Sequence, residues 1–408
     1  MHPKEILIAD YGYVLPPERI AQHPLQNRDQ SRLLLYDSGK ISENTFTHLA
    51  THLPPNSTLI FNDTKVIHAR IIFRNERDAA IEVFLLEPVE PMRDMQLAMF
   101  THETCVWRCF IGNAKKWREE CLSKKIRIGE QNIILEARHR GKAEEDFLVE
   151  FNWGSEKFSF AQILEAAGHV PLPPYIKRKS AGEDEDRYQT IYAVQDGSVA
   201  APTAGLHFTE KVFDELKQKN IQSLFTTLHV SAGTFLPVKA AKMEEHHMHE
   251  EQIVIRKDFL EKLLEIVSAG SPIIAVGTTS LRTLESIYWI GKKISEGDES
   301  LIVNQWDPYE TRDAAFTIGH SLSAILDLMK TRQAPHLVAE TRLLIAPGYD
   351  FKFAHGLITN FHLPKSTLLL LIAAFIGDDW KKVYAYALEN DFRFLSYGDG
   401  SLLWRKTA

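Results

Sequence analysis

The chain has 408 residues, with 47 Lys and Arg against 54 Asp and Glu and a net charge of −7. Hydrophobic residues make up 44% and charged residues 25%, which are ordinary globular values and exclude disordered, collagenous and low-complexity chains. The three cysteines (Cys105, Cys109, Cys121) contain no CxxC pair, so a disulfide framework and a zinc ribbon are both disfavoured. No secretory signal is visible, and the longest apolar run, 368–376, is too short for a spanning helix of ~20 residues. We therefore expect a soluble, cytoplasmic protein without membrane contact.

The first half of the chain is predicted to contain two kinds of structure. Strand-rich α/β material opens the chain, with a strand at 57–61. From 71 to 151, short β-type runs are separated by Gly112, Gly129 and Gly141, a spacing typical of a small all-β barrel or sandwich. We interpret this block as an insertion.

Helical and strand patterns alternate after the insertion, which predicts a mixed or largely parallel sheet with helices on its faces. The expected helices and strands are 161–167, 209–219, 222–230, 259–268, 273–276 and a helix from 281. The fold prediction is an α/β main domain with a mixed sheet and flanking helices, formed by 1–70 and 152–408 and interrupted by a small all-β barrel domain at 71–151. We expect 291–335 to be a peripheral elaboration and the charged run 183–186 to be a solvated, mobile loop.

Three junctions share one pattern, in which an apolar segment runs into glycine and hydroxyl residues and then into a helix. The clearest is the strand 273–276 followed by Thr278, Thr279 and Ser280, because open α/β sheets bind ligands at the carboxyl ends of their strands. Free N–H groups and hydroxyls there suit a carboxylate, a phosphate or a ribose. The same residues are also common helix caps, so this alternative stays open.

The other two junctions are APTAGLHFT, with Thr203, Gly205 and His207, and LITNFHLPKST. The latter lacks the G-x-x-x-x-G-K frame of a phosphate loop, which argues against an ATPase. The chain also has no G-x-S-x-G elbow of a hydrolase and no Gly-rich loop after a first strand, as a methyltransferase would commonly have.

The densest cluster of titratable side chains is HHMHEE, which includes His249 and Glu251. It follows the strand 222–230 and its polar end, where Ser231, Gly233 and Thr234 stand. HExxH is absent, so metal binding is less favoured than proton transfer or substrate contact, and an exposed structural role remains an alternative. Basic residues interleaved with aromatic ones, at 115–118, 124–127, 138–142 and 177–179, suit an RNA backbone, but ordinary solvated edge strands are the favoured alternative on sequence alone.

These motifs together resemble the S-adenosylmethionine:tRNA ribosyltransferase-isomerase family of queuosine biosynthesis. The matching segments are LPPERIAQHP, SRLLLY, FNDTKVIHAR, RYQTIYA followed by GSVAAPTAGLHFT, LHVSAGTFLPV, HHMHEE, AVGTTSLRTLES, and LITNFHLPKSTLLLLIAAFIG with SYGDGSLL, in a fixed order over most of the chain. The resemblance implies an enzyme that transfers and isomerises the ribosyl group of S-adenosylmethionine onto 7-aminomethyl-7-deazaguanine at the tRNA wobble position. The products are epoxyqueuosine-tRNA, adenine and methionine. S-adenosylmethionine is a co-substrate, and no metal or cofactor is implied.

We therefore expect a monomer that binds S-adenosylmethionine and the tRNA anticodon. The residues predicted for proton transfer are His207, His249 and Glu251. Those predicted for substrate binding are Asn62 and Asp63 at the cleft between domains, Thr203, Gly205, Ser231, Gly233, Thr234, Thr278, Thr279, Ser280, Arg282, Asn360, His362, Lys365 and Ser366. The alternatives are an S-adenosylmethionine-dependent RNA methyltransferase and a tRNA-binding homologue without turnover.

Overall fold

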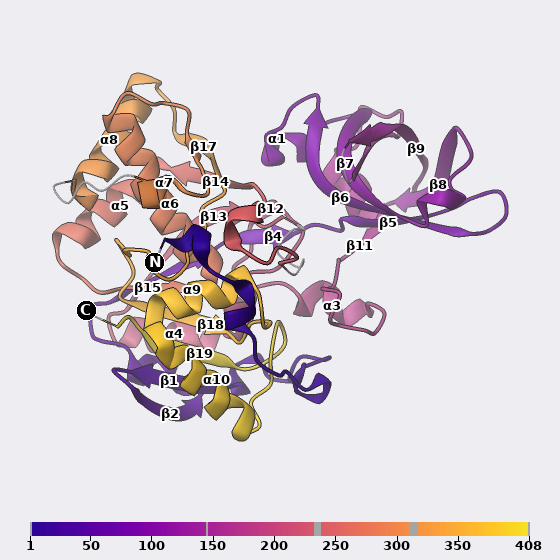
Figure 1. The fold of residues 1–408 in the computed structure, drawn as a ribbon. Coiled ribbons are helices and arrows are strands. Elements are labelled where there is room, and N and C mark those ends of the chain that lie inside the picture. The colour runs from indigo at the N-terminus through magenta and orange to yellow at the C-terminus, as the bar shows by residue number, and fades with distance from the viewer. Residues whose placement is uncertain (1, 144–145, 232–237, 311–315, 407–408) are drawn as a thin grey trace.

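The computed structural model describes residues 2–143, 146–231, 238–310 and 316–406, which form two sheets with their helices (Figure 1). The larger sheet is mixed, as expected. Its strands in spatial order are β16 (Ile302–Val303), β17 (His336–Thr341), β14 (Glu251–Arg256), β13 (Gln222–His229), β3 (Thr58–Asn62), β15 (Ile273–Val276), β18 (Gly356–Asn360), β19 (Gly400–Trp404), β1 (Arg32–Asp37) and β2 (Lys40–Thr45).

The middle of this sheet is parallel. β13, β3, β15 and β18 are neighbours that run in the same direction, while β14 and β19 pair antiparallel to them on either side. Parallel strands end at the same edge, so the residues that follow β13, β15 and β18 come together there.

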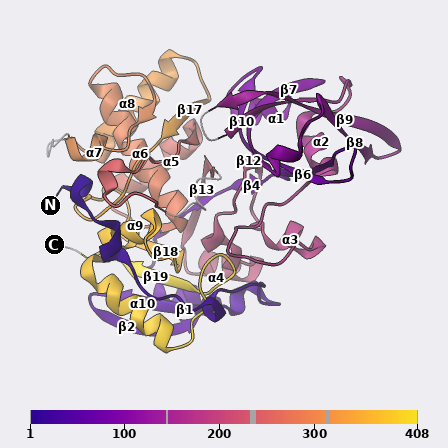
Figure 2. The ribbon, with the colours of Figure 1, turned by 45° about the vertical axis from the view of Figure 1, so that its right-hand side comes forward.

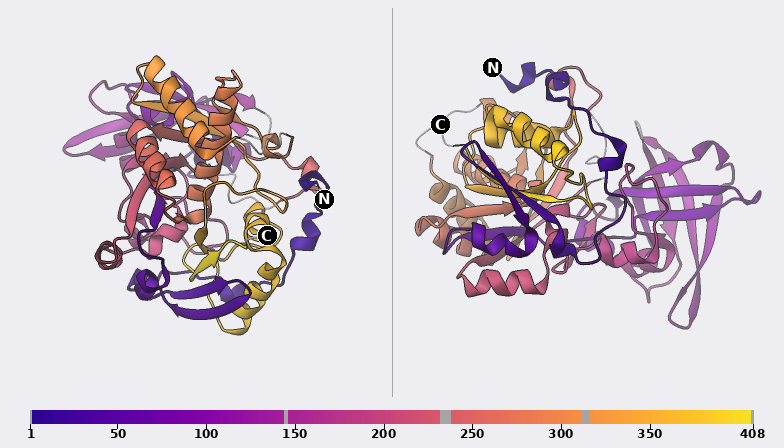
Figure 3. Two further views of the ribbon diagram at one scale, coloured as in Figure 1. Left: turned by 90° about the vertical axis from the view of Figure 1, so that its left-hand side faces the viewer. Right: turned by 90° about the horizontal axis from the view of Figure 1, so that it is seen from below.

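Side chains of these strands alternate between two apolar cores, as a period of two requires. Ile60 and Ala275 belong to one core, whereas Phe61, Ile274 and Val276 belong to the other. The first core is covered by α5 (Lys257–Ser268), α6 (Gly277–Ser295), α8 (Ile318–Thr331), α9 (Thr367–Ile376) and α10 (Trp380–Glu389). The second is covered by α4 (Glu210–Gln218) and the 3-10 helix Phe46–His52, so helices lie on both faces (Figure 3).

The stretch 291–335, expected to be peripheral, belongs instead to the main layer. It contains α7 (Asp307–Glu310) and α8, and Leu322 and Ile325 of α8 are buried in the first core. α8 lies so close to α6 that a Cβ added at Gly291 would stand 2.1 Å from Ser321 Oγ and 2.3 Å from its carbonyl oxygen. The mixed charge of this stretch concealed the apolar face of α8.

The second sheet is antiparallel and curled. Its strands in spatial order are β11 (Gly168–His169), β5 (Arg70–Arg74), β6 (Ala80–Glu90), β7 (Thr104–Gly112), β10 (Asp146–Asn152), β9 (Gln131–Ala143) and β8 (Cys121–Ile128). Its core also includes Phe160, Ile163 and Leu164 of α2 (Phe160–Ala167), a helix that lies beyond the predicted block 71–151. Among the described residues no ladder joins β8 back to β5 or β11, so the sheet is a half-barrel and not a closed barrel.

The two sheets meet at a small parallel pair, β4 (Thr64–Val66) and β12 (Gln195–Ser198), which lies between them (Figure 2). The short helix α1 (Met95–Met99) of the second sheet is held there by two hydrogen bonds. The Met95 N–H donates to Gln252 Oε1 (3.0 Å), and Gln96 Nε2 donates to Gln195 Oε1 (2.6 Å).

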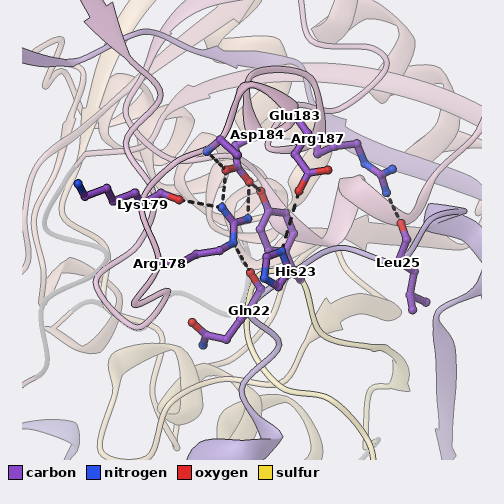
Figure 4. Close-up of polar contacts among 10 residues, drawn as sticks. Gln22, His23, Leu25, Arg178, Lys179, Glu183, Asp184 and Arg187 are labelled. Carbon is purple, nitrogen blue, oxygen red and sulfur yellow. Dashed lines mark hydrogen bonds and ion pairs between the residues drawn. The ribbon is translucent and has the colours of Figure 1, made fainter.

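The prediction of a solvated loop at 183–186 is correct in that Glu183, Glu185 and Asp186 are exposed, but wrong for the conformation of the segment and for Asp184. These residues form α3 (Gly182–Arg187), and Asp184 is fully buried in an ion pair with Arg178 (Figure 4). A run of four acidic residues indicates a solvated segment only when no cation inside the protein pairs with one of them. The sequence does not show that Arg178 pairs with Asp184.

We predict that Gly291→Ala destabilises the protein by about 1–3 kcal/mol, because the added methyl group overlaps the Ser321 backbone and forces α6 and α8 apart. Urea unfolding followed by circular dichroism measures the change. Gly319→Ala in α8 is the control, since its Cβ would meet nothing nearer than 3.8 Å. Equal unfolding free energies for the two variants would contradict the close helix contact.

Candidate active site

A pocket opens at the edge where the parallel strands end. Its walls come from Val230 after β13, from the start of α6 and from the segment after β18. The remaining lining comes from the APTAGLHFT junction and from loops. The residues that line it are Tyr175, Tyr188, Ala200, Ala201, Pro202, Thr203, Ala204, Val230, Gly277, Thr278, Thr279, Thr359, Asn360, Phe361, His362, Leu363, Pro364, Ser366, Leu368, Leu395 and Ser396.

The start of α6 presents hydroxyl groups to this pocket. Gly277 has a positive φ of 89°, which turns the chain sharply from β15 into the helix. Thr278 and Thr279 follow and line the pocket, and Thr279 Oγ1 is buried without a hydrogen-bond partner among the described residues. Neither threonine caps the helix, whose N-cap is Val276, so the binding interpretation of this junction is favoured over the capping one. Ser280 lies outside the lining and donates to the Val276 carbonyl (2.8 Å).

Asn360 at the end of β18 points an unpaired acceptor at the pocket edge. Its Nδ2 donates to the Asp399 carbonyl (3.4 Å), which fixes the amide orientation because a carbonyl can only accept. The same Nδ2 lies 3.1 Å from His207 Nε2, so that ring nitrogen must accept. Asn360 Oδ1 is left buried without a partner among the described residues.

His207 therefore lies behind the pocket and not in it. With Nε2 accepting from Asn360, the proton is on Nδ1, which donates to Ser31 Oγ (2.8 Å). Burial lowers the pKa of His207 to about 4, so the ring is neutral at physiological pH. Both ring nitrogens are engaged, so this ring orients Asn360 and has no free lone pair.

His362 is the imidazole that lines the pocket. Its Nε2 lies 3.0 Å from Thr359 Oγ1, and no hydrogen bond to the described residues involves its Nδ1. Its backbone N–H donates to the Tyr384 hydroxyl (3.1 Å), and its carbonyl accepts from Tyr13, so the ring is presented from a fixed backbone. Burial lowers its pKa to about 4.

One wall of the pocket consists of two aromatic residues, Tyr175 and Tyr188, together with Ser396, and is called the aromatic wall below. The sequence analysis did not assign these residues to the site. The Tyr175 hydroxyl lies 2.7 Å from Ser396 Oγ, which joins two segments 221 residues apart. The available signal was the position of these residues next to the motifs, since Tyr188 lies in RYQTIYA and Ser396 directly precedes YGDG.

Glu251 and Arg282 form an ion pair beside the pocket. Glu251 is buried, and Arg282 is on α6, one helical turn after Thr278. Glu251 Oε1 also accepts from the Ser231 N–H at 3.3 Å. Arg282 Nε and Ser231 Oγ are buried without partners among the described residues. The structure thus places these three predicted residues next to one another, although none of them lines the pocket.

Several other predicted residues lie away from the pocket lining. Asn62 holds the backbone of Leu228 through both amide atoms, and Asp63 accepts from Thr227 and Arg256. Burial raises the pKa of Asp63. Gly205 packs against Tyr192, and His249 and Lys365 are exposed. Two further predicted residues, Thr203 and Ser366, do line the pocket. Gly233 and Thr234 fall outside the described residues.

The described residues contain no group of three or more His, Cys, Asp or Glu side chains that could hold a metal ion. Likewise, none of the helices described is long and apolar enough to cross a bilayer.

Because its parallel strands end together at a pocket, the chain falls in the class of α/β proteins that bind a small ligand at the carboxyl edge of a sheet.

A family profile described as "Queuosine biosynthesis protein" matches residues 8–403. The S-adenosylmethionine:tRNA ribosyltransferase-isomerase of Trichlorobacter lovleyi is 36% identical over 98% of this chain and 100% of its own length. The protein of the same name from Treponema denticola is 35% identical, with 98% and 100% covered. A solved structure of S-adenosylmethionine tRNA ribosyltransferase from Thermotoga maritima is 27% identical, covers 97% and 99%, and has a TM-score of 0.46.

The chain belongs to the queuosine biosynthesis protein family. The resemblance drawn from the motifs is confirmed, and with it the prediction of an enzyme of tRNA modification.

Buried neutral histidines make stability depend on pH. Burial lowers the pKa of His229 to about 4 from the usual 6.5, as it does for His207 and His362. Between pH 4 and pH 6.5 the unfolded chain binds protons at these histidines and the folded chain does not. Their contribution to the free energy of unfolding is therefore complete above pH 6.5 and is lost as pH falls towards 4.

We predict that the unfolding free energy drops from pH 8 to pH 5 by about 2 kcal/mol for each such histidine. His229→Gln removes one titrating group and should reduce the drop by that amount, measured by urea unfolding at both pH values. His247→Gln is the control because His247 is exposed. The prediction fails if the two variants show the same drop.

Proposed function

We propose that this chain transfers the ribosyl group of S-adenosylmethionine to 7-aminomethyl-7-deazaguanine at the tRNA wobble position and isomerises it to the epoxide-bearing carbocycle of epoxyqueuosine. Adenine and methionine leave. The observation that carries the reaction is the family match over nearly the whole chain, and the pocket at the strand ends supports the place where it occurs. We also propose the cytoplasm as its location, because its tRNA substrate is found there.

The pocket is proposed to hold the adenosine part of the donor. Adenine and ribose carry amine and hydroxyl donors, and Asn360 Oδ1 is a buried acceptor that lacks a partner among the described residues. Thr279 Oγ1 can donate or accept, and the methyl groups of Ala200 and Ala201 offer an apolar surface for the purine. We propose His207 as the positioning residue that keeps Asn360 Oδ1 directed to the ligand.

His362 is proposed as the proton acceptor for the first step. The sulfonium of S-adenosylmethionine acidifies the adjoining ribose C5′–H, so a neutral imidazole in contact with it suffices as a base. Loss of this proton starts the expulsion of adenine. Attack by the exocyclic amine of the deazaguanine and departure of sulfur as methionine follow. His249 and Glu251 stay predictions for proton transfer, and we propose that Glu251 also holds Arg282 beside the pocket.

We predict that His362→Asn lowers the rate of adenine release by about 10²-fold or more while donor affinity changes by less than about threefold, since a general base contributes 10²–10⁴-fold. Precursor-bearing tRNA and S-adenosylmethionine are incubated with each variant, and adenine is quantified by chromatography. Asn360→Ala should instead weaken donor binding, because it removes the acceptor. Full turnover by His362→Asn would refute the assignment.

A methyl-labelled donor separates this reaction from the alternative of RNA methylation. In ribosyl transfer the label leaves with methionine, whereas in methylation it enters the RNA. Wild-type protein that binds tRNA but releases no adenine would instead be a homologue without turnover.

The curled sheet is proposed to be an inserted domain that contacts the tRNA backbone. An open cavity at one end of it is lined by Lys115, Lys116 and Arg118, all exposed and without an ion pair among the described residues. Glu119 in the same lining is occupied by the backbone N–H groups of Glu76 and Arg118. Counting every charged residue of the lining, five cationic side chains (Arg74, Arg77, Lys115, Lys116 and Arg118) stand against three carboxylates (Glu76, Glu119 and Glu120), and this excess of positive charge suits phosphates.

We predict that Lys115→Gln, Lys116→Gln and Arg118→Gln together lower the salt dependence of tRNA binding. The slope of log K against log salt should fall by about two to three, close to one for each phosphate that the variant no longer neutralises. Filter binding at several salt concentrations measures it. The control triple is Lys257→Gln, Lys262→Gln and Arg332→Gln, which changes two residues of α5 and the residue after α8. Both helices are distant from the curled sheet (Figure 1). Identical slopes for the two triples would refute the proposed surface.

A further inference from the structure

Asp184 is a buried carboxylate near the pocket that accepts several hydrogen bonds. It is fully buried and accepts two hydrogen bonds from the Arg178 guanidinium at 2.6 Å each. The Ala181 N–H and the Tyr397 hydroxyl each donate to it at 2.8 Å. Burial opposes ionisation of Asp184, but these donors outweigh it and lower its pKa.

Arg178 carries the network onward to the N-terminal segment. Its Nε donates to the Gln22 carbonyl at 2.9 Å (Figure 4). The Gln22 side chain in turn donates to the Tyr175 carbonyl at 3.0 Å and accepts from the Lys177 N–H at 2.9 Å. Three segments that are distant in sequence are thereby joined around one buried ion pair.

Each residue of the aromatic wall is directly tied to this network. The Tyr188 N–H donates to the Asp184 carbonyl at 2.9 Å, and its ring packs edge-on against Tyr397 with centroids 5.9 Å apart. Tyr175 is held by Gln22 and by Ser396, and Ser396 directly precedes Tyr397. Tyr175 and Ser396 lie in loops, and Tyr188 directly follows the six-residue helix α3, which is too short to be stable alone.

We propose that Arg178, Asp184 and Tyr397 form a wall latch, a set of positioning residues that holds Tyr175, Tyr188 and Ser396 in the shape that binds the donor. This inference rests on the proposed function, because it concerns the same pocket. The latch residues lie outside the pocket lining, so they act on affinity through the wall and leave the chemical step to residues that line the pocket.

The latch predicts a separation of KM from kcat. Asp184→Asn keeps the size of the side chain but leaves Arg178 buried without its counter-charge, which disrupts the joined segments. The KM for S-adenosylmethionine should rise by about tenfold or more, since a hydrogen bond to a charged group is worth that factor in affinity. The kcat at saturating donor should stay within about threefold of wild type, because the residues that line the pocket are unchanged.

Two milder variants keep the test decisive if Asp184→Asn folds poorly. Tyr397→Phe removes only the hydroxyl that donates to Asp184, and Arg178→Lys keeps the charge but cannot donate bidentately. Both should raise KM by a smaller factor. Asp146→Asn is the matched control, because Asp146 is a buried partner of Arg108 in the curled sheet. It should lower the melting temperature and leave the donor KM within about twofold.

The latch is overturned if Asp184→Asn and Tyr397→Phe leave KM at the wild-type value, or if Asp146→Asn raises it equally. Hydrogen exchange at the Tyr188 amide supplies a readout that does not require turnover, and it should accelerate in Asp184→Asn and not in Asp146→Asn. If wild-type protein releases no adenine, the proposed function fails, whereas unchanged exchange in an active protein refutes the latch alone.

Discussion

Neighbouring strands that run parallel and end at one edge of the sheet determine where this molecule can bind a ligand. β13, β15 and β18 deliver Val230, Gly277 and Asn360 to a common edge, where the ladder can no longer satisfy backbone and side-chain polar groups. Unpaired groups there are costly when buried unless a ligand or water completes them. Thr279 Oγ1 and Asn360 Oδ1 are such groups, and they lie on different elements that only this strand arrangement brings together.

The polar groups behind the pocket have the opposite property, because all of them except Asn360 Oδ1 have hydrogen-bond partners. Ser31, His207, Asn360 and the Asp399 carbonyl form one chain of bonds in which each donor and acceptor role is fixed by its neighbour. The carboxylate of Asp399 in turn accepts from the Arg32 and Arg393 backbones. A rigid and fully bonded support of this kind directs one free acceptor outward.

The sequence could predict the elements whose signal is local. The strand 273–276 coincides with β15, the helix expected at 259–268 lies within α5, and α4 lies within the helix expected at 209–219. The motif junctions also located much of the pocket, because a strand followed by glycine and hydroxyl residues marks a strand end in any parallel sheet.

The roles of individual residues could not be predicted, because they depend on partners distant in sequence. His207 has the residue type of a proton-transfer group, yet Asn360, 153 residues away, occupies its Nε2. Asp184 belongs to an acidic run and is buried only because Arg178 and Tyr397 meet it. Conversely, His249 lies in the densest titratable cluster and is exposed. A single sequence contains no information about such pairings unless a motif already associates the partners.

The junction between the two sheets links the pocket to the proposed tRNA surface. Gly197 has a φ of 143°, and a Cβ there would stand 2.3 Å from Met95 Cγ and 2.8 Å from His229 Nδ1. The absent side chain therefore leaves room beside β12 for both Met95 of α1 and His229 at the end of β13. His229 Nδ1 also lies 3.0 Å from Thr64 Oγ1, which connects the end of β13 to β4. Because Val230, the residue after His229, lines the pocket, the junction between the two sheets is one residue along the chain from the candidate site. The proposed donor site and the sheet proposed to contact tRNA are therefore connected through the end of a single strand, β13.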